Sequence, residues 1–135
     1  MSISPGQNQL TEHRRAVVKG EERLMSWIHD GTLLSVDKVQ AAWGVDRQTV
    51  DTAREGGEIF SIWLKGKHWY PCEVLKFERA DLAAINRALD GIDPSSKLIF
   101  LLHKHGGLAG KTPADAVVDG KFDDVLRLAA VWANI

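Results

Sequence analysis

The stretch over residues 106–132 constrains the fold of this chain most, because it carries start and stop signals for two consecutive helices. Thr112 followed by Pro113 predicts a helix start, since a hydroxyl caps free backbone amides and proline suits the first helical position. Gly120 predicts the stop. After it, apolar residues recur at spacings of three and four, which predicts a second helix with one buried face: Phe122, Val125, Leu126, Leu128, Ala129 and Trp132.

The same stretch follows a longer pattern: a small-residue turn, Leu-x-Gly-Lys-x-Pro, a short helix, Asp-Gly and a final amphipathic helix. The matching residues are Leu108, Gly110, Lys111, Pro113, Asp119 and Gly120. On these residues it resembles the C-terminal toxin-binding domain of the Xre/MbcA/ParS antitoxins. The alternative is an ordinary helical hairpin, because such caps and glycine stops also occur in unrelated helical proteins.

The resemblance implies a protein partner for this C-terminal region. The partner would be a RES-domain toxin, an enzyme that degrades nicotinamide dinucleotide, and binding would block entry to the toxin's active site. The toxin-binding residues would come from the glycine-rich loop and from the exposed side and end of the last helix: Gly107, Leu108, Gly110, Lys111, Arg127 and Ile135.

Residues 34–50 look like a helix-turn-helix. Ser35 and Asp46 are the expected caps of two short helices over 35–43 and 46–55. Gly44 permits a tight turn between the helices. Apolar side chains are spaced to pin the two helices together: Val39, Trp43, Val45 and Val50.

The start of the second helix would project its polar residues outward, as in DNA-reading helices. Arg47 and Gln48 are suited to bidentate hydrogen bonds with base edges, Thr49 to a phosphate or a thymine methyl, and Arg54 to backbone phosphate. Acids on the same helix count against DNA contact: Asp46, Asp51 and Glu55. The alternative is a scaffold or protein-interaction surface.

Residues 59–71 predict a β-hairpin, since β-branched and aromatic residues flank a Lys-Gly-Lys turn. The hairpin would be a wing with Lys65, Lys67 and His68 at its tip. This order resembles the MerR or excisionase type of winged helix. Trp63 and Trp69 would form a cross-strand aromatic pair that stabilises the wing.

The remaining helices are predicted at three places. One begins at a Thr11 cap and ends near His29, and another covers Leu82 to about Gly91. A third begins at the Asp93 cap, followed by a first-turn proline, and its apolar residues give it a core face: Leu98, Ile99, Leu101 and Leu102. Three tryptophans on apolar helix faces are expected in the core: Trp27, Trp43 and Trp132.

Together these elements predict a mainly α-helical protein, with a winged helix-turn-helix and its small β-hairpin followed by a C-terminal helical bundle module. We expect three segments: a disordered start with a helix over 1–30, the winged helix-turn-helix over 31–76, and the toxin-binding-like region over 77–135. A chain of this length can also build one ordinary core. Two modules that share a seam are the preferred arrangement.

Composition excludes several function classes. The chain is 44% hydrophobic and 26% charged, carries a net charge of −1, and has no apolar run long enough to span a membrane. It has no secretion signal, so a cytoplasmic location is expected. Cys72 is the single cysteine, and His103 and His105 are spaced poorly for a metal clamp. We expect no catalytic constellation, no metal site and no cofactor.

The functional expectation is therefore an antitoxin. It would bind and neutralise a RES-domain toxin through its C-terminal region, bind operator DNA through its N-terminal region, repress its own operon and form a homodimer. The alternative is a stand-alone DNA-binding regulator whose C-terminal region only dimerises. A neighbouring co-transcribed toxin gene would distinguish the first from the second.

Overall fold

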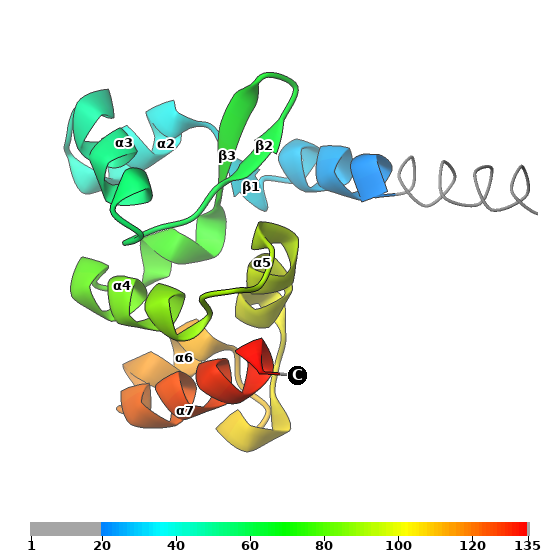
Figure 1. The fold of residues 1–135 in the computed structure, drawn as a ribbon, viewed down its shortest axis with the longest axis vertical. Helices are drawn as coiled ribbons and strands as arrows, with labels where there is room; N and C mark the ends of the chain where they lie inside the picture. Colours follow the sequence, from blue (N-terminus) through cyan, green and yellow to red (C-terminus); the bar gives the residue numbers. More distant parts are fainter. Residues whose placement is uncertain (1–19, 135) are drawn as a thin grey trace, which may run out of the picture.

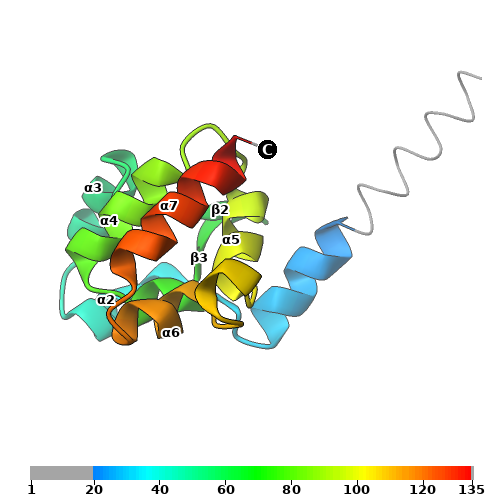
Figure 2. The same ribbon diagram turned by 90° about the horizontal axis from the view of Figure 1, so that it is seen from below.

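The computed structural model describes residues 20–134 and has a mainly helical fold with a small three-stranded antiparallel sheet (Figure 1). Three expectations lie outside the described residues: the disordered start, the first part of the helix from Thr11, and the toxin contact at Ile135. The described part of the first helix covers residues 20–29 and ends before Gly31, as predicted. It projects from the main body (Figure 2), although Leu24, Trp27 and Ile28 pack against the core.

The predicted pair of short helices is present as α2 (Val36–Trp43) and α3 (Arg47–Glu55). Gly44 joins them with a left-handed backbone conformation, which glycine adopts without steric cost. Val39 and Val50 are fully buried between the helices. Asp46 caps α3, since its carboxylate accepts the backbone N–H of Thr49 at 2.9 Å. Ser35 stands at the N-cap of α2 without a side-chain capping bond, contrary to its expected capping role.

The hairpin consists of β2 (Ile62–Leu64) and β3 (Lys67–Pro71). Lys65 and Gly66 form its turn, both with positive φ, which suits the tight turn of a two-residue hairpin. A short strand that the sequence did not predict, β1 (Leu33–Leu34), pairs with the other side of β3, giving the order β1-β3-β2. Residues 59–60 are buried but lie outside the strands.

The expected Trp63–Trp69 pair is wrong, because the register places Trp63 opposite His68 and Ile62 opposite Trp69. The rings of Trp63 and His68 meet edge to face with centroids 4.7 Å apart. Trp69 instead donates its indole N–H to the Leu64 carbonyl at 2.9 Å. The two tryptophans therefore point to opposite faces of the hairpin, since neighbouring residues on a strand alternate.

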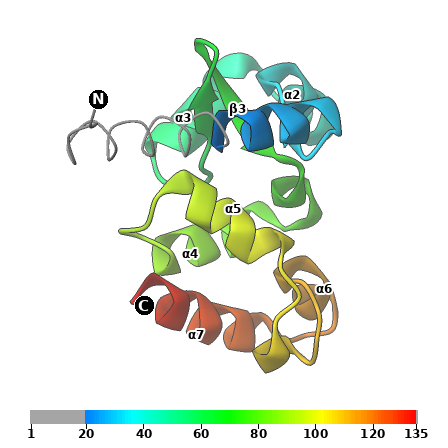
Figure 3. The same cartoon turned by 90° about the vertical axis from the view of Figure 1, so that its right-hand side faces the viewer.

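The C-terminal part begins with a 3₁₀ turn, η1 (Cys72–Lys76), and continues with α4 (Arg79–Ala88) and α5 (Pro94–Leu102). A second 3₁₀ turn, η2 (Gly106–Leu108), leads into α6 (Pro113–Val118) and α7 (Phe122–Ala133). The predicted caps are confirmed: Asp93 accepts the Ser96 amide, and Thr112 accepts the Asp115 amide. In Figures 1 and 3, α4 and α5 lie between the α2–α3 pair with the sheet on one side and α7 on the other.

One hydrophobic cluster runs through the described chain. It includes Val50 and Tyr70 from the N-terminal elements, and Leu82 and Val125 from α4 and α7. The tryptophans expected in the core, Trp27, Trp43 and Trp132, are partly buried at its edge. The seam between the two expected modules is therefore a continuous core.

Polar contacts also cross this seam. Asn86 on α4 donates to the Gly57 carbonyl at 2.8 Å and accepts from Lys97 at 3.1 Å. Arg79 pairs with Glu58 at 3.0 Å, and its guanidinium lies 4.7 Å from the ring centre of Trp43. These contacts fix α4 against the end of α2 and the segment that follows α3.

Candidate functional site

At the N-terminal end of α3, two of the three side chains expected to contact bases are exposed to solvent. The side chain of Arg47 is 74% exposed, and Gln48 is exposed beside it. Thr49 is half-buried, because its hydroxyl donates to the Asp46 carboxylate at 2.7 Å. Arg47 and Gln48 are therefore free to contact a ligand, whereas Thr49 serves the cap.

Acidic side chains hold the arginines of α3. Asp51 lies 3.9 Å from Arg47 and 3.6 Å from Arg54, and Glu55 lies 3.9 Å from Arg54. The side chain of Arg54 is only 23% exposed, and its Nε is buried without a hydrogen-bond partner in the described chain. The expected phosphate contact by Arg54 therefore requires a rearrangement, because this side chain faces inward.

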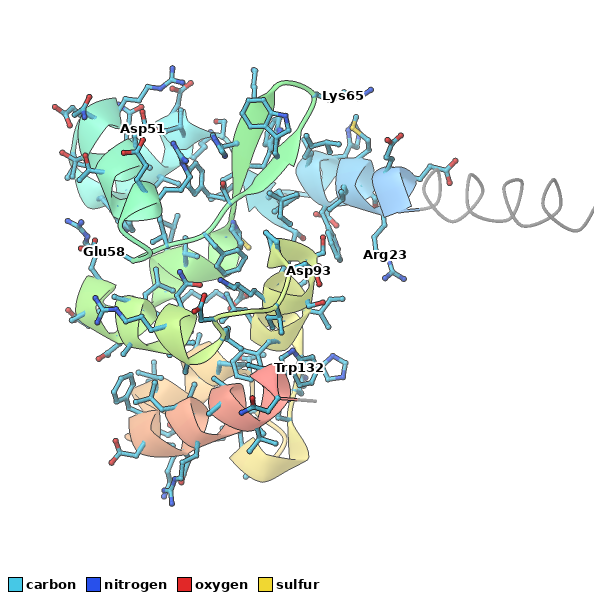
Figure 4. All side chains as sticks on the ribbon, viewed as in Figure 1. Arg23, Asp51, Glu58, Lys65, Asp93 and Trp132 are labelled. Carbon is cyan, nitrogen blue, oxygen red and sulfur yellow. The ribbon has the colours of Figure 1, made fainter. Side chains whose placement is uncertain are left out.

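The three expected wing-tip residues lie in different surroundings. Lys65 sits at the turn and points away from α3 (Figure 4). Lys67 places its ammonium 5.9 Å from the ring centre of Trp69. His68 shares a 2.7 Å hydrogen bond between its Nδ1 and the Ser61 hydroxyl. Burial lowers the pKa of His68, and Arg54 lowers it further, which disfavours the charged form of this side chain.

A cleft of about 280 Å³ lies between the start of α2, the start of α3 and the hairpin. It brings together Arg47, Lys67 and His68 of the predicted DNA-binding set. The other members of the set lie outside its lining: Gln48, Thr49, Arg54 and Lys65. The other lining residues are Ser35, Val36, Asp37, Asp51, Trp63, Gly66 and Tyr70. The cleft is thus an open site with polar and aromatic lining, beside the helix that is expected to contact bases.

Two residues of this cleft were missed by the sequence reading. Trp63 was expected to pack against Trp69, yet it is 63% exposed. Tyr70 is fully buried, and its hydroxyl has no hydrogen-bond partner among the described residues. Burial raises the pKa of this hydroxyl, while the neighbouring Arg54 guanidinium opposes the shift. The strand alternation that puts His68 and Tyr70 on one face was the available signal.

The second candidate surface is the loop between α5 and α6. His105 is buried, and its Nε2–H donates to the Phe100 carbonyl at 2.9 Å. Its backbone pairs with that of Lys111, closing the loop. Within the loop, Ala109 and Gly110 have φ values of +56° and +77°. The predicted glycine-rich turn therefore has a fixed shape.

The predicted toxin-binding residues are distributed unequally around this loop. Gly107, Gly110 and Lys111 are exposed, and Lys111 forms an ion pair with Asp119. Leu108 is 5% exposed and belongs to the core, so its expected surface role is not compatible with its burial.

Arg127 on α7 is 77% exposed and is connected to the loop through Asp124. It donates to the Asp124 carboxylate at 2.7 Å. Asp124 also lines a cavity of about 130 Å³ with Gly107, Lys111 and Asp119. Of the exposed members of the predicted set, Gly107 and Lys111 line this small depression, whereas Gly110 and Arg127 lie outside its lining.

Within residues 20–134, no three His, Cys, Asp or Glu side chains gather as a metal site, and no helix is long and apolar enough to cross a membrane. The rings of His103 and His105 lie 5.6 Å apart, but the buried imidazole of His105 is bonded to the backbone.

Comparison with known proteins returned no family model that matches the chain, no similar curated protein and no similar solved structure. The class that the fold itself defines is a mainly helical protein with a three-stranded antiparallel sheet.

Proposed function

We propose that this protein is an antitoxin that binds operator DNA through α3 and the hairpin and neutralises a RES-domain toxin through its C-terminal helices. The observation that carries the proposal is the arrangement of α2, α3 and the hairpin. Two helices joined by a left-handed glycine leave Arg47 and Gln48 exposed, and a hairpin with two lysines lies beside them. A winged helix-turn-helix of this kind enters the major groove with the first turn of its second helix.

The balanced charge of the chain determines what kind of DNA binding to expect. With a net charge of −1, and with Asp51 and Glu55 on α3, the general attraction to DNA is weak. Binding then depends on specific contacts by Arg47 and Gln48. We therefore propose an operator-specific protein, as a homodimer whose two α3 helices contact half-sites about one DNA turn apart.

The toxin half of the proposal rests on the sequence resemblance and is supported by the shape of the α5–α6 loop. Gly110 and Gly120 occupy positive-φ positions at the two ends of the α6 unit. Lys111 and Asp119 pair across that unit, and both line one depression with Asp124, the ion-pair partner of Arg127. These charged, exposed residues are suited to a polar partner surface.

Tagged full-length protein, purified from its native cell, tests both halves. Intact-mass analysis of a stoichiometric partner and sequencing of the bound DNA would identify the toxin and the operator. We expect a small enzyme whose capture is weakened by Lys111→Glu and Arg127→Glu. Met25→Lys, on the exposed face of the first helix, is the matched control and should retain it. A partner captured equally by all variants, or absent, would contradict the toxin half.

The alternative, a stand-alone regulator, is favoured by one specific observation. The apolar face of α7 is already used inside the molecule, where Val125 and Ala129 are fully buried. Core packing and dimerisation would then account for the C-terminal region without a toxin partner. Recovery of self-associated protein with DNA, and of no enzyme, would favour this alternative.

A further inference from the structure

The cleft between α2, α3 and the hairpin has buried polar groups at its base that lack hydrogen-bond partners. Tyr70 is fully buried there, and its hydroxyl has no hydrogen-bond partner within residues 20–134. Beside it, the Nε of Arg54 is also buried and unpaired. Buried polar groups are ordinarily hydrogen-bonded, and an unpaired one costs free energy. The Tyr70 oxygen can accept from the neighbouring Arg54 guanidinium, but the Tyr70 O–H and the Arg54 Nε–H still lack an acceptor among the described residues.

The start of α2 supplies further donors at the edge of the same cleft. Ser35 and Val36 line it, and the Ser35 side chain makes no capping bond to the first amides of this eight-residue helix. Free amides at a helix N-terminus, together with the helix dipole, attract anions. An anionic oxygen is an acceptor that suits both the N-terminus of α2 and the Tyr70 hydroxyl.

The charges around the cleft balance each other. Arg47 and Lys67 line the cleft, and Arg54 lies behind Tyr70. Asp37 and Asp51 also line the cleft, and Glu55 lies 3.9 Å from Arg54. Burial lowers the pKa of His68, which disfavours a further positive charge there. An anion in the cleft would therefore be held by specific hydrogen-bond donors, which suits one singly charged phosphodiester group.

The aromatic wall indicates what is attached to the anion. Trp63 lines the cleft and is 63% exposed, so its indole is available to a ligand bound there. Exposed aromatic and apolar side chains on DNA-binding proteins pack against sugars and bases. A sugar next to the phosphate would cover this indole.

We propose that the cleft is the site of one DNA backbone phosphate. In this site Arg47 contacts the phosphate, the Tyr70 hydroxyl donates to it after the side chains that cover this atom move aside, and Trp63 covers the adjoining sugar. The proposal rests on the DNA-binding half of the proposed function and adds to it two residues, Trp63 and Tyr70, that the motif did not assign. Hydroxyl and charged side chains commonly fix a protein on the backbone in this way.

Tyr70→Phe is the central test, because it removes only the unpaired hydroxyl and leaves the packing of the ring. We expect the full chain to bind its DNA about 3–10-fold more weakly, which is the net contribution of one ordinary hydrogen bond. Its melting temperature should stay the same or rise, since no bond is lost in the free protein. Trp63→Ala should also weaken binding, whereas Trp27→Phe, away from the cleft, should not.

A neutral phosphate in the DNA locates the contact. Duplexes with a single methylphosphonate at successive positions remove one charge at a time. For the wild-type protein, we expect one position at which binding weakens. Tyr70→Phe should be less sensitive to the methylphosphonate at that position and equally sensitive elsewhere. This coupling distinguishes a direct phosphate contact from a general change of the protein.

The results that would overturn the phosphate site differ from those that would overturn DNA binding. If the wild-type protein binds DNA but Tyr70→Phe binds equally well and no phosphate couples to it, the phosphate site is overturned while DNA binding stands. If the wild-type protein binds no duplex, the DNA half of the proposed function fails. Titration of both proteins with a 5′-mononucleotide then decides: binding that depends on Tyr70 supports a phosphate-ester site for a free nucleotide, and no binding overturns the site.

Discussion

His105 is the buried side chain that shapes the candidate partner surface. Its imidazole donates to the Phe100 carbonyl near the end of α5 and meets the rings of Phe100 and Trp132 at 4.9 and 5.5 Å. Its backbone is bonded to that of Lys111. One residue therefore ends α5, closes the loop and contacts the end of α7.

His105→Ala should lower the free energy of unfolding by about 2–3 kcal/mol, because it leaves a buried carbonyl unpaired and opens a gap beside two aromatic rings. Urea denaturation of the full chain measures this effect. His103→Ala removes an exposed imidazole two residues away and should change the stability by less than about 0.5 kcal/mol. Equal losses in the two variants would contradict the structural role of His105.

At the scale of elements, helix α3 carries both the side chains proposed to contact DNA and acidic side chains that pair with them. Asp51 lies within 4 Å of Arg47 and Arg54, and a DNA phosphate would compete with its carboxylate for both arginines. Exposed ion pairs of this kind are weak, so the competition is modest. The acids therefore reduce general attraction to DNA without preventing specific contact.

Asp51→Asn should tighten DNA binding about 2–5-fold, the equivalent of one exposed ion pair removed from competition. Fluorescence anisotropy with a labelled duplex measures the change. Asp123→Asn, which makes the same charge change on the distant helix α7, should have little effect at physiological salt because of screening. Weaker binding by Asp51→Asn would mean that Asp51 positions Arg47 productively.

Helix α5 depends on the carboxylate that caps it. Asp93 accepts the Ser96 hydroxyl at 2.7 Å and the Ser96 amide at 3.1 Å, and these bonds lower its pKa below the ordinary value of 3.8. A lowered pKa contributes stability that is present above the unfolded value and is lost as pH falls through the folded value. This contribution therefore disappears below about pH 4.

Asp93→Asn should flatten the fall in stability below about pH 4, because asparagine caps a helix without titrating. Asp93→Ala should lower the free energy of unfolding by about 1 kcal/mol at pH 7. Denaturation curves between pH 2 and 7, about the range in which carboxylates titrate, measure both effects. An unchanged acid profile in the asparagine variant would show that Asp93 does not contribute to it.

The sequence predicted those elements whose signals are local. The caps at Asp46, Asp93 and Thr112, and the glycine stops at Gly44 and Gly120, depend on neighbouring residues and were correct. The two-residue strand β1 was missed, since its pairing with β3 joins segments far apart in the sequence. The Trp63–Trp69 pairing failed because the register depends on the turn.

The candidate site was predicted less well than the helices. Motif spacing placed Arg47 and Gln48 on an exposed helix end, but the inward orientation of Arg54 follows from its contacts with Asp51 and Tyr70. Burial of Leu108 likewise depends on how the loop packs. Such features arise from tertiary packing, which a pattern along one chain does not specify.

At the scale of the whole molecule, the two expected modules are joined by a shared core. Val125 and Ala129 of α7 pack with buried residues of α4, and Asn86 and Arg79 of α4 contact the N-terminal elements. Removal of residues 121–135 would therefore expose the core and not merely delete a binding surface. Point changes on the exposed surface are the better probe of partner binding.

A shared core predicts that the two regions unfold together. Val125→Ala should lower stability by about 2 kcal/mol and shift one common transition, whether it is followed by far-ultraviolet circular dichroism or by hydrogen exchange in α3 and α7. Two separate transitions, with only the C-terminal one moved by Val125→Ala, would contradict this arrangement.

The central claim is that the first turn of α3 reads DNA. The most direct measurement is the affinity of wild type and Arg47→Ala for the duplex recovered with the protein, by fluorescence anisotropy at fixed salt. The account predicts a loss of ~1–3 kcal/mol, about 5–150-fold, with relaxed preference at one base position. Arg127→Ala should bind as wild type does. Equal affinity of Arg47→Ala and wild type would contradict the claim.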